Sequence, residues 1–191
     1  MIRELVTDEA ILSTPCTPAT VEDAELAADL IETLRATEDG CCLAANQVGV
    51  TRSVAVYLDD DGEAHVLYNP KLLFGIAATQ TVEGCLTREE PSKVRRFQKV
   101  RVTYDEIVDG ALKQRRREFV GWEAQMVQHM IDHCRGRYVS GIPGFIYPCE
   151  HTSAGRPSRG LSALYLFEAR KSLPPPLLII ITVCRWQSSL C

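Results

Sequence analysis

The sequence has no hydrophobic run long enough to cross a membrane. Its most apolar stretch, residues 177 to 184, is far shorter than the roughly 20 residues that a membrane helix needs. The N-terminus also lacks the apolar core and the small-residue cleavage site of a secretory signal. We therefore expect a cytoplasmic protein, in whose reducing surroundings the 8 cysteines are mostly free thiols.

The chain has no strong excess of charge of either sign. Its net charge of -4, hydrophobic fraction of 46% and charged fraction of 24% are ordinary for a globular protein. The charges are unevenly spread, because residues 88 to 118 hold ten Lys or Arg among six acids. This basic stretch could attract a polyanion such as the ribosome surface, although most such runs are solvated faces. No motif for specific nucleic-acid binding accompanies it.

The hydrophobic pattern predicts an α+β fold. Thr20 and Asp23 resemble an N-terminal capping pair, and the spacing of the following apolar residues predicts an amphipathic helix from 21 to 37. A second helical pattern runs from Trp122 to about Cys134. Turn signals at 60–62 and 109–110 predict hairpins between strands, which we expect at residues 53–58, 66–68, 99–104 and 115–120.

The composition changes near residue 141, where Gly, Pro and Ser cluster and the preceding pattern stops. At 191 residues the chain is long enough for one domain with a sizeable core and an added tail. We therefore predict a folded domain at residues 1–140 and a poorly ordered tail at residues 141–191.

Two histidines four residues apart on the second predicted helix suggest a metal site. His129 and His133 would present both imidazoles to one point, and Cys85 lies upstream as a possible third ligand. One thiolate and two imidazoles leave the fourth position of a tetrahedral cation open for water, which is the arrangement of a catalytic rather than a structural site.

The sequence lacks the carboxylate that usually accompanies such a pair. Metallohydrolases with a His-Glu-x-x-His motif use the glutamate to take a proton from the water, and here Met130 follows the first histidine. Loss of a positioned general acid or base costs about 10² to 10⁴ in rate. Asp132 is a poor substitute, since it lies about 200° around the helix from Met130.

Three segments together resemble the signatures of the peptide deformylase family. They are Gly40 to Gln47, Glu83 to Thr87 and Gln128 to His133, in the same order and with similar spacing. The resemblance covers about residues 1 to 140. It implies antiparallel sheets around a central metal-binding helix, and removal of the formyl group from the N-terminal formyl-methionine of nascent peptides.

The resemblance also implies roles for individual residues. One divalent metal ion would be held by Cys85, His129 and His133; Fe²⁺ is the usual ion, and Zn²⁺, Ni²⁺ or Co²⁺ can replace it. Gln47, through its side-chain amide, and Leu86, through its backbone N–H, would stabilise the oxyanion that forms on the formyl group. Glu83 and Asp132 would be supporting acids. Residues of the first segment, namely Gly40, Cys42 and Leu43, would contact the formyl-methionyl peptide.

The chain departs from the family pattern at positions that matter for this activity. Met130 replaces the glutamate, Cys42 replaces a usual glycine, and Asn46 stands where proline or a small polar residue is common. Three hypotheses follow: a slow deformylase, an inactive homologue that binds metal or peptide, and a folded protein with no ligand at this site. The first predicts turnover of a formyl-methionyl peptide, the second affinity without turnover, and the third no bound metal.

Overall fold

The computed structural model of this chain describes residues 1–137. Two short N-terminal helices, α1 (Glu9–Leu12) and η1 (Val21–Asp23), precede the longer helix α2 (Ala24–Ala36). Thr20 and Asp23 form a capping box at the start of η1, so the predicted capping pair is present. A strand, β1 (Cys42–Ala44), then leads into the one-turn helix η2 (Ala45–Val48). The remaining elements are β2 (Val54–Leu58), β3 (Ala64–Cys85), β4 (Arg88–Val108), β5 (Ala111–Val120) and α3 (Gly121–Cys134).

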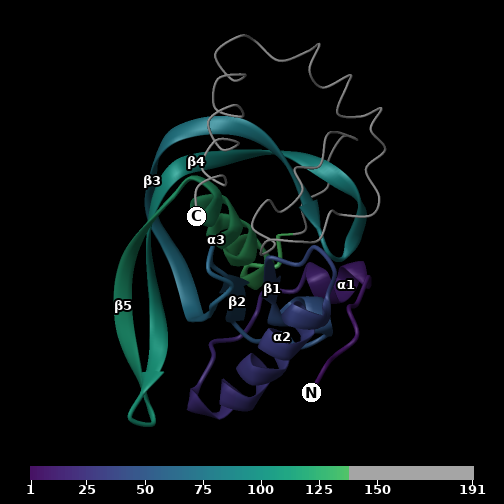
Figure 1. Cartoon of the computed structure of the whole chain (residues 1–191), viewed down its shortest axis with the longest axis vertical. Coiled ribbons are helices and arrows are strands. Elements are labelled where there is room, and N and C mark those ends of the chain that lie inside the picture. Colours follow the sequence, from purple (N-terminus) through teal and green to yellow (C-terminus); the bar gives the residue numbers. More distant parts are fainter. Residues whose placement is uncertain (138–191) are drawn as a thin grey trace, which may run out of the picture. The chain divides into compact units, whose positions relative to one another are not determined.

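The five strands form one antiparallel sheet in the order β1-β2-β3-β4-β5. Each strand pairs with its sequence neighbours, and the hairpin turns at 60–62 and 109–110 fall where the sequence predicts them. Figure 1 shows β3, β4 and β5 curving around α3, while α2 lies beside β1 and β2. The fold class is therefore confirmed as α+β, with antiparallel strands enclosing the helix that carries the two histidines.

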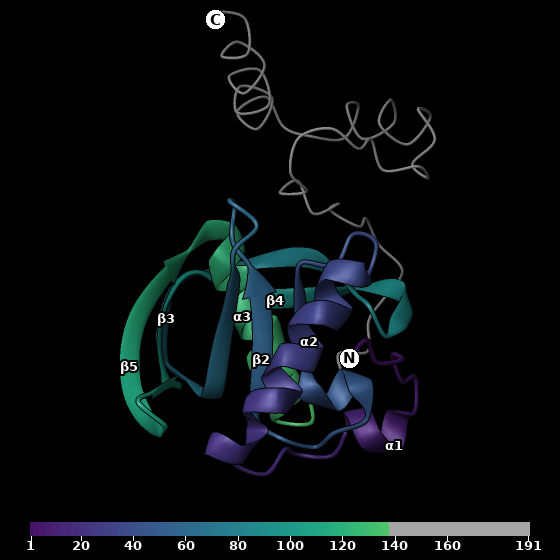
Figure 2. The same cartoon turned by 60° about the horizontal axis from the view of Figure 1, so that its bottom comes forward.

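Strand β2 is buried on both faces and separates two hydrophobic cores. Ala55 and Tyr57 belong to a core that includes α3, whereas Val54 and Val56 belong to a core that includes α2. This alternation follows from the two-residue period of a strand. Figure 2 shows α2 and α3 with β2 between them. The metal-site helix is thus fixed by apolar packing rather than by exposed loops.

Helix α3 ends in a close contact with the N-terminal segment. Gly136 has a positive φ of 63°, and a Cβ at this position would lie 2.5 Å from the backbone oxygen of Ser13. Cys16 N–H donates to Cys134 O at 2.9 Å, next to the second histidine. Only glycine permits this backbone approach, and the approach holds the end of α3 against the N-terminal segment.

Strands β3 and β4 are much longer than the sequence pattern predicts. The predicted strands at 66–68 and 99–104 are parts of strands of 22 and 21 residues. Register shifts between Tyr68 and Lys71, Leu72 and Phe74, and Glu83 and Cys85 interrupt the alternation on which a strand prediction depends. The predicted tail at 141–191 lies outside the described residues. Within residues 1–137, no helix has the length and apolar character needed to span a membrane.

Candidate metal centre

The three predicted metal ligands converge in the structure. Cys85 lies at the end of β3, and His129 and His133 lie one turn apart on α3. Their donor atoms are all within 4.8 Å of one another. Cys85 Sγ is 3.3 Å from His133 Nε2, which is 3.2 Å from His129 Nε2. Tetrahedral bonds of the lengths typical for Zn²⁺ would set such atoms about 3.3 to 3.6 Å apart, so the donor set fits one divalent cation.

Electrostatics favour the thiolate form of Cys85. Burial raises the pKa of this thiol, but hydrogen bonds with His129 and His133 outweigh burial and lower the pKa to about 5. Thr87 Oγ1 lies 3.2 Å from the same sulfur. A thiolate is the form of cysteine that binds metals, so the site presents its anionic ligand at neutral pH.

A buried ion-pair network orients His129. Its Nδ1 lies 2.9 Å from Glu83 Oε1, which leaves Nε2 turned toward the other ligands. Arg96 of β4 binds Glu83 through Nε at 3.1 Å from Oε2 and binds Asp132 through Nη1. Burial raises the pKa of Glu83, but its bonds to His129 and Arg96 lower the pKa to about 2. Both predicted supporting acids are thus held by one guanidinium, and Glu83 orients a ligand as carboxylates behind metal-binding histidines commonly do.

Gln47 is held with its amide nitrogen toward the cysteine. Ala44 N–H donates to Gln47 Oε1 at 3.0 Å, and Gln47 Nε2 lies 3.5 Å from Cys85 Sγ. Because the oxygen is already engaged by the backbone, the amide cannot turn over without losing that bond. The geometry therefore presents an N–H donor beside the ligand cluster.

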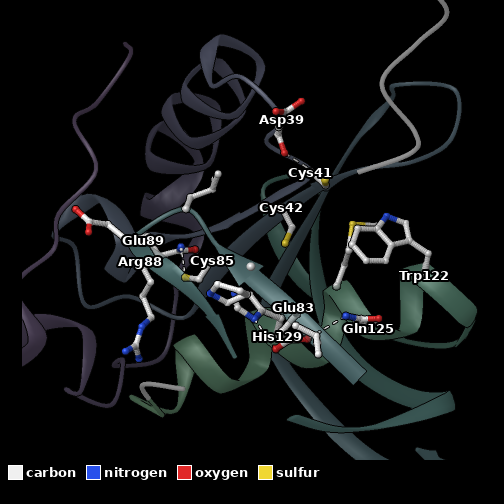
Figure 3. A pocket seen from close by; sticks show the side chains of 16 residues that line it. Asp39, Cys41, Cys42, Glu83, Cys85, Arg88, Glu89, Trp122, Gln125 and His129 are labelled. Carbon is white, nitrogen blue, oxygen red and sulfur yellow. Dashed lines mark hydrogen bonds and ion pairs between the residues drawn. The ribbon is translucent and has the colours of Figure 1, made fainter. Parts of the chain in front are cut away.

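A cavity of about 290 Å³ opens next to the ligands (Figure 3). Cys85, His129, Gln47 and Leu86 line it, together with apolar surface from Trp122 and Met126. The charged side chains among its described lining residues are Asp39, Glu83, Arg88 and Glu89. A cavity of this size, partly apolar and adjacent to a candidate metal site, can hold one side chain of a peptide.

The residues predicted to contact substrate lie in different surroundings. Cys42 lines the cavity, and Figure 3 shows its side chain pointing toward Cys85 and His129. Burial and the charges of Cys85 and Glu83 raise the pKa of the Cys42 thiol to about 12, so it is neutral at pH 7. Leu43 instead packs fully buried in the core beside α2, and Gly40 precedes β1 next to Leu34. Their predicted substrate contacts stay predictions.

Met130 lies in the apolar core rather than in the cavity. Its side chain is 0% exposed and packs in the core shared by α3 and the sheet, and it is absent from the described residues that line the cavity. Of the acids near the ligands, Glu83 uses both oxygens in bonds to His129, Arg96 and Gln125. Asp132 lines a different hollow and is paired with Arg96. Neither carboxylate is free to take the missing glutamate's role.

The sequence pattern gave no reason to select Arg96 or Gln125. Arg96 belongs to the basic stretch that the pattern assigns to a solvated face, yet its side chain is only 9% exposed. Gln125 donates from Nε2 to Glu83 Oε2 at 3.2 Å and lines the cavity. The signal that could have identified Gln125 is its helix face: Trp122, Gln125 and Met126 share one face with His129, at spacings of three and four residues. Four of the described cysteines, namely Cys16, Cys42, Cys85 and Cys134, are free thiols, whereas Cys41 is disulfide-bonded; within the described residues this agrees with the prediction that most cysteines are free.

Comparison with known proteins agrees with this geometry. The family model for polypeptide deformylase matches residues 2–141. A peptide deformylase of Clostridium beijerinckii is 33% identical over 137 residues, which cover 71% of this chain and 98% of that protein. A peptide deformylase of Aquifex aeolicus is 35% identical over 160 residues, which cover 76% and 90%.

The fold is shared with solved structures as well. The crystal structure of a peptide deformylase from Legionella pneumophila superposes with a TM-score of 0.65 at 26% identity, covering 90% of this chain and 92% of that one. The peptide deformylase from Thermus thermophilus gives a TM-score of 0.63 at 27% identity, covering 71% and 81%. The sequence, the ligand cluster and the fold lead to the same conclusion: the chain belongs to the polypeptide deformylase family.

Proposed function

We propose that this chain is a metallohydrolase that removes the formyl group from N-terminal formyl-methionine of nascent peptides, at a rate reduced by the replacement of the catalytic glutamate. The observation that carries the proposal is the convergence of Cys85, His129 and His133 beside a cavity. The family implies this reaction, and the donor set fits one divalent ion. Fe²⁺ is the ion that we propose, with Zn²⁺, Ni²⁺ or Co²⁺ as substitutes; a cytoplasmic site of action is part of the proposal.

The metal ion and the residues around it would have different roles in this reaction. When bound, a divalent ion supplies Lewis acidity that lowers the pKa of a coordinated water molecule toward neutrality. Gln47 Nε2, and the backbone N–H of Leu86, would donate hydrogen bonds to the oxygen of the formyl group as negative charge develops on it. Preorganised donors of this kind are each worth about 3 kcal/mol. Trp122 and Met126 would contact the methionine side chain within the cavity.

Proton transfer is the step of the proposed reaction for which the site has no available side chain. In this chain Met130 cannot accept a proton, and Glu83 and Asp132 are engaged with Arg96. Solvent in the cavity would have to carry the proton to the leaving amine. This lack of a proton acceptor favours a second candidate function, in which the protein is an inactive homologue that binds a metal ion or a formyl-methionyl chain end.

The basic stretch at 88–118 supports a further proposal, that the ribosome surface is a partner.

One assay separates these functions. The protein is purified anaerobically, loaded with Fe²⁺ and given a formyl-Met-Ala-Ser peptide, with bound metal and peptide affinity measured in the same preparation. We expect slow turnover that disappears in a Cys85→Ser variant. Peptide affinity without turnover would establish the binding function instead. Absence of bound metal in the unmodified protein would refute the hydrolase, and absence of both bound metal and peptide affinity would refute both functions.

Cys42 is expected to obstruct the peptide. Its side chain occupies the cavity where the family usually has glycine, and an overlap of one side chain costs about 1 to 3 kcal/mol. A Cys42→Gly variant should therefore bind the formyl-Met-Ala-Ser peptide roughly tenfold or more tightly, measured by calorimetry. A Cys16→Ala variant is the matched control, since Cys16 is also a free thiol but does not line the cavity. Equal affinities in all three proteins would show that Cys42 leaves the peptide path open.

A further inference from the structure

The two candidate ligand histidines differ in the hydrogen-bond partner of Nδ1, the ring nitrogen that does not face the other candidate ligands. His129 has its Nδ1 2.9 Å from Glu83 Oε1. His133 is 3% exposed, and its Nδ1 is buried with no hydrogen-bond partner among the described residues. Ligand histidines almost always donate this second N–H to a carboxylate, a carbonyl or a water molecule. His133 therefore needs an acceptor that the predicted site does not supply.

Asn46 carries a buried acceptor that lacks a hydrogen-bond donor. Its side chain is 0% exposed, and Oδ1 is buried without a partner in the described part of the chain. The same side chain already contacts His133, because Asn46 Nδ2 donates to His133 O at 2.9 Å and to Leu12 O at 3.3 Å. A buried donor and a buried acceptor are thus unsatisfied on two residues that are hydrogen-bonded to each other.

The orientation of the Asn46 amide is well determined by its neighbours. Turning the amide over would place Oδ1 against the carbonyl oxygens of Leu12 and His133, which are both acceptors. Nδ2 must therefore stay on these carbonyls, and Oδ1 must stay on the other side. An unsatisfied buried N–H or C=O group costs about 1 to 3 kcal/mol, so pairing the two atoms relieves two such penalties.

We propose that Asn46 is a positioning residue for the metal ligand His133, with Asn46 Oδ1 accepting the Nδ1–H of the imidazole either directly or through one buried water. A neutral imidazole has one N–H, and a bond from Nδ1–H fixes Nε2 as the lone-pair nitrogen. His133 Nε2 is the atom that faces Cys85 and His129. Asn46 would then do for His133 what Glu83 does for His129. The inference rests on the metal-binding part of the proposed function.

The test compares variants that separate the acceptor from the donor of Asn46. Asn46→Leu removes both groups and should weaken Zn²⁺ binding by about 10- to 100-fold. Asn46→Asp keeps an acceptor oxygen, so Zn²⁺ affinity should stay close to that of the unmodified protein even if the midpoint of thermal unfolding falls. Asn69→Ala is the matched control: it removes another carboxamide that bonds the backbone of Ala19, and should lower stability without changing Zn²⁺ affinity.

A second readout reports directly on the imidazole. In the Zn²⁺-loaded protein, nitrogen-15 NMR of the histidine rings should show a protected Nδ1–H for His133, which Asn46→Leu loses and Asn46→Asp retains. If Asn46→Leu binds Zn²⁺ as tightly as the unmodified protein and its His133 signal is unchanged, the inference is wrong. If the unmodified protein binds no Zn²⁺, the metal site itself is refuted and the inference with it.

Discussion

Replacing Met130 by glutamate is expected to raise the rate of deformylation by the Fe²⁺-loaded protein by about 10² to 10⁴-fold. The substitution restores a carboxylate next to His129, at the position where the family has its general acid and base. Met130 is fully buried, and burial raises the pKa of a carboxyl group. A pKa nearer to neutrality suits a base that must take up and return a proton at pH 7.

The decisive comparison is between Met130→Glu and Met130→Gln. Glutamine has nearly the same shape but cannot accept a proton, so Met130→Gln should remain as slow as the unmodified protein. Bound iron is quantified in all three proteins, because a rate that merely follows metal content says nothing about the base. Both polar variants should lose stability, since they place a polar group in an apolar core. If neither Met130→Glu nor the unmodified protein turns over the peptide despite bound iron, the deformylase activity is refuted and only the ancestry remains.

Replacing Arg96 by methionine is expected to lower the free energy of unfolding by about 3 to 5 kcal/mol. Arg96 is 9% exposed and binds two carboxylates, Glu83 and Asp132, which are 6% and 17% exposed. Removal of the guanidinium leaves both acids close together without their cation. Because Arg96 no longer offsets its share of the desolvation of Glu83, the pKa of Glu83 should rise from its present value of about 2, although His129 still lowers it.

Urea unfolding of the metal-free protein measures this loss. Arg101→Met is the matched control on the same strand: Arg101 pairs with Glu118, and both side chains are 37% exposed. An exposed pair of this kind contributes up to about 1 kcal/mol. A similar loss for the two variants would contradict the view that burial sets the value of the Arg96 network.

The secondary structure that sequence could predict is the part whose residues repeat regularly. Helix α2 and helix α3 agree with the predicted helices to within a few residues, because apolar residues recur along them at helical spacing. Much of β3 and β4 escapes prediction. Register shifts interrupt the pairing at Tyr68–Phe74 and at Glu83–Cys85, and residues 75–82 between them include no buried side chain that would mark an alternating apolar face. The ladder between these strands is decided by pairing over long sequence separation, which a local pattern does not record.

The sequence by itself determined the family, the three candidate ligands and the loss of the glutamate, because each of these is a matter of residue type at a fixed spacing. Tertiary structure decided which side chains serve the ligands. Arg96 looks like one member of a basic run, and Asn46 like one residue of a small-residue stretch. The fold buries Arg96 against Glu83 and Asn46 against His133. Their roles depend on burial and on partners distant in the sequence, and these exist only once β3, β4 and η2 are packed around α3.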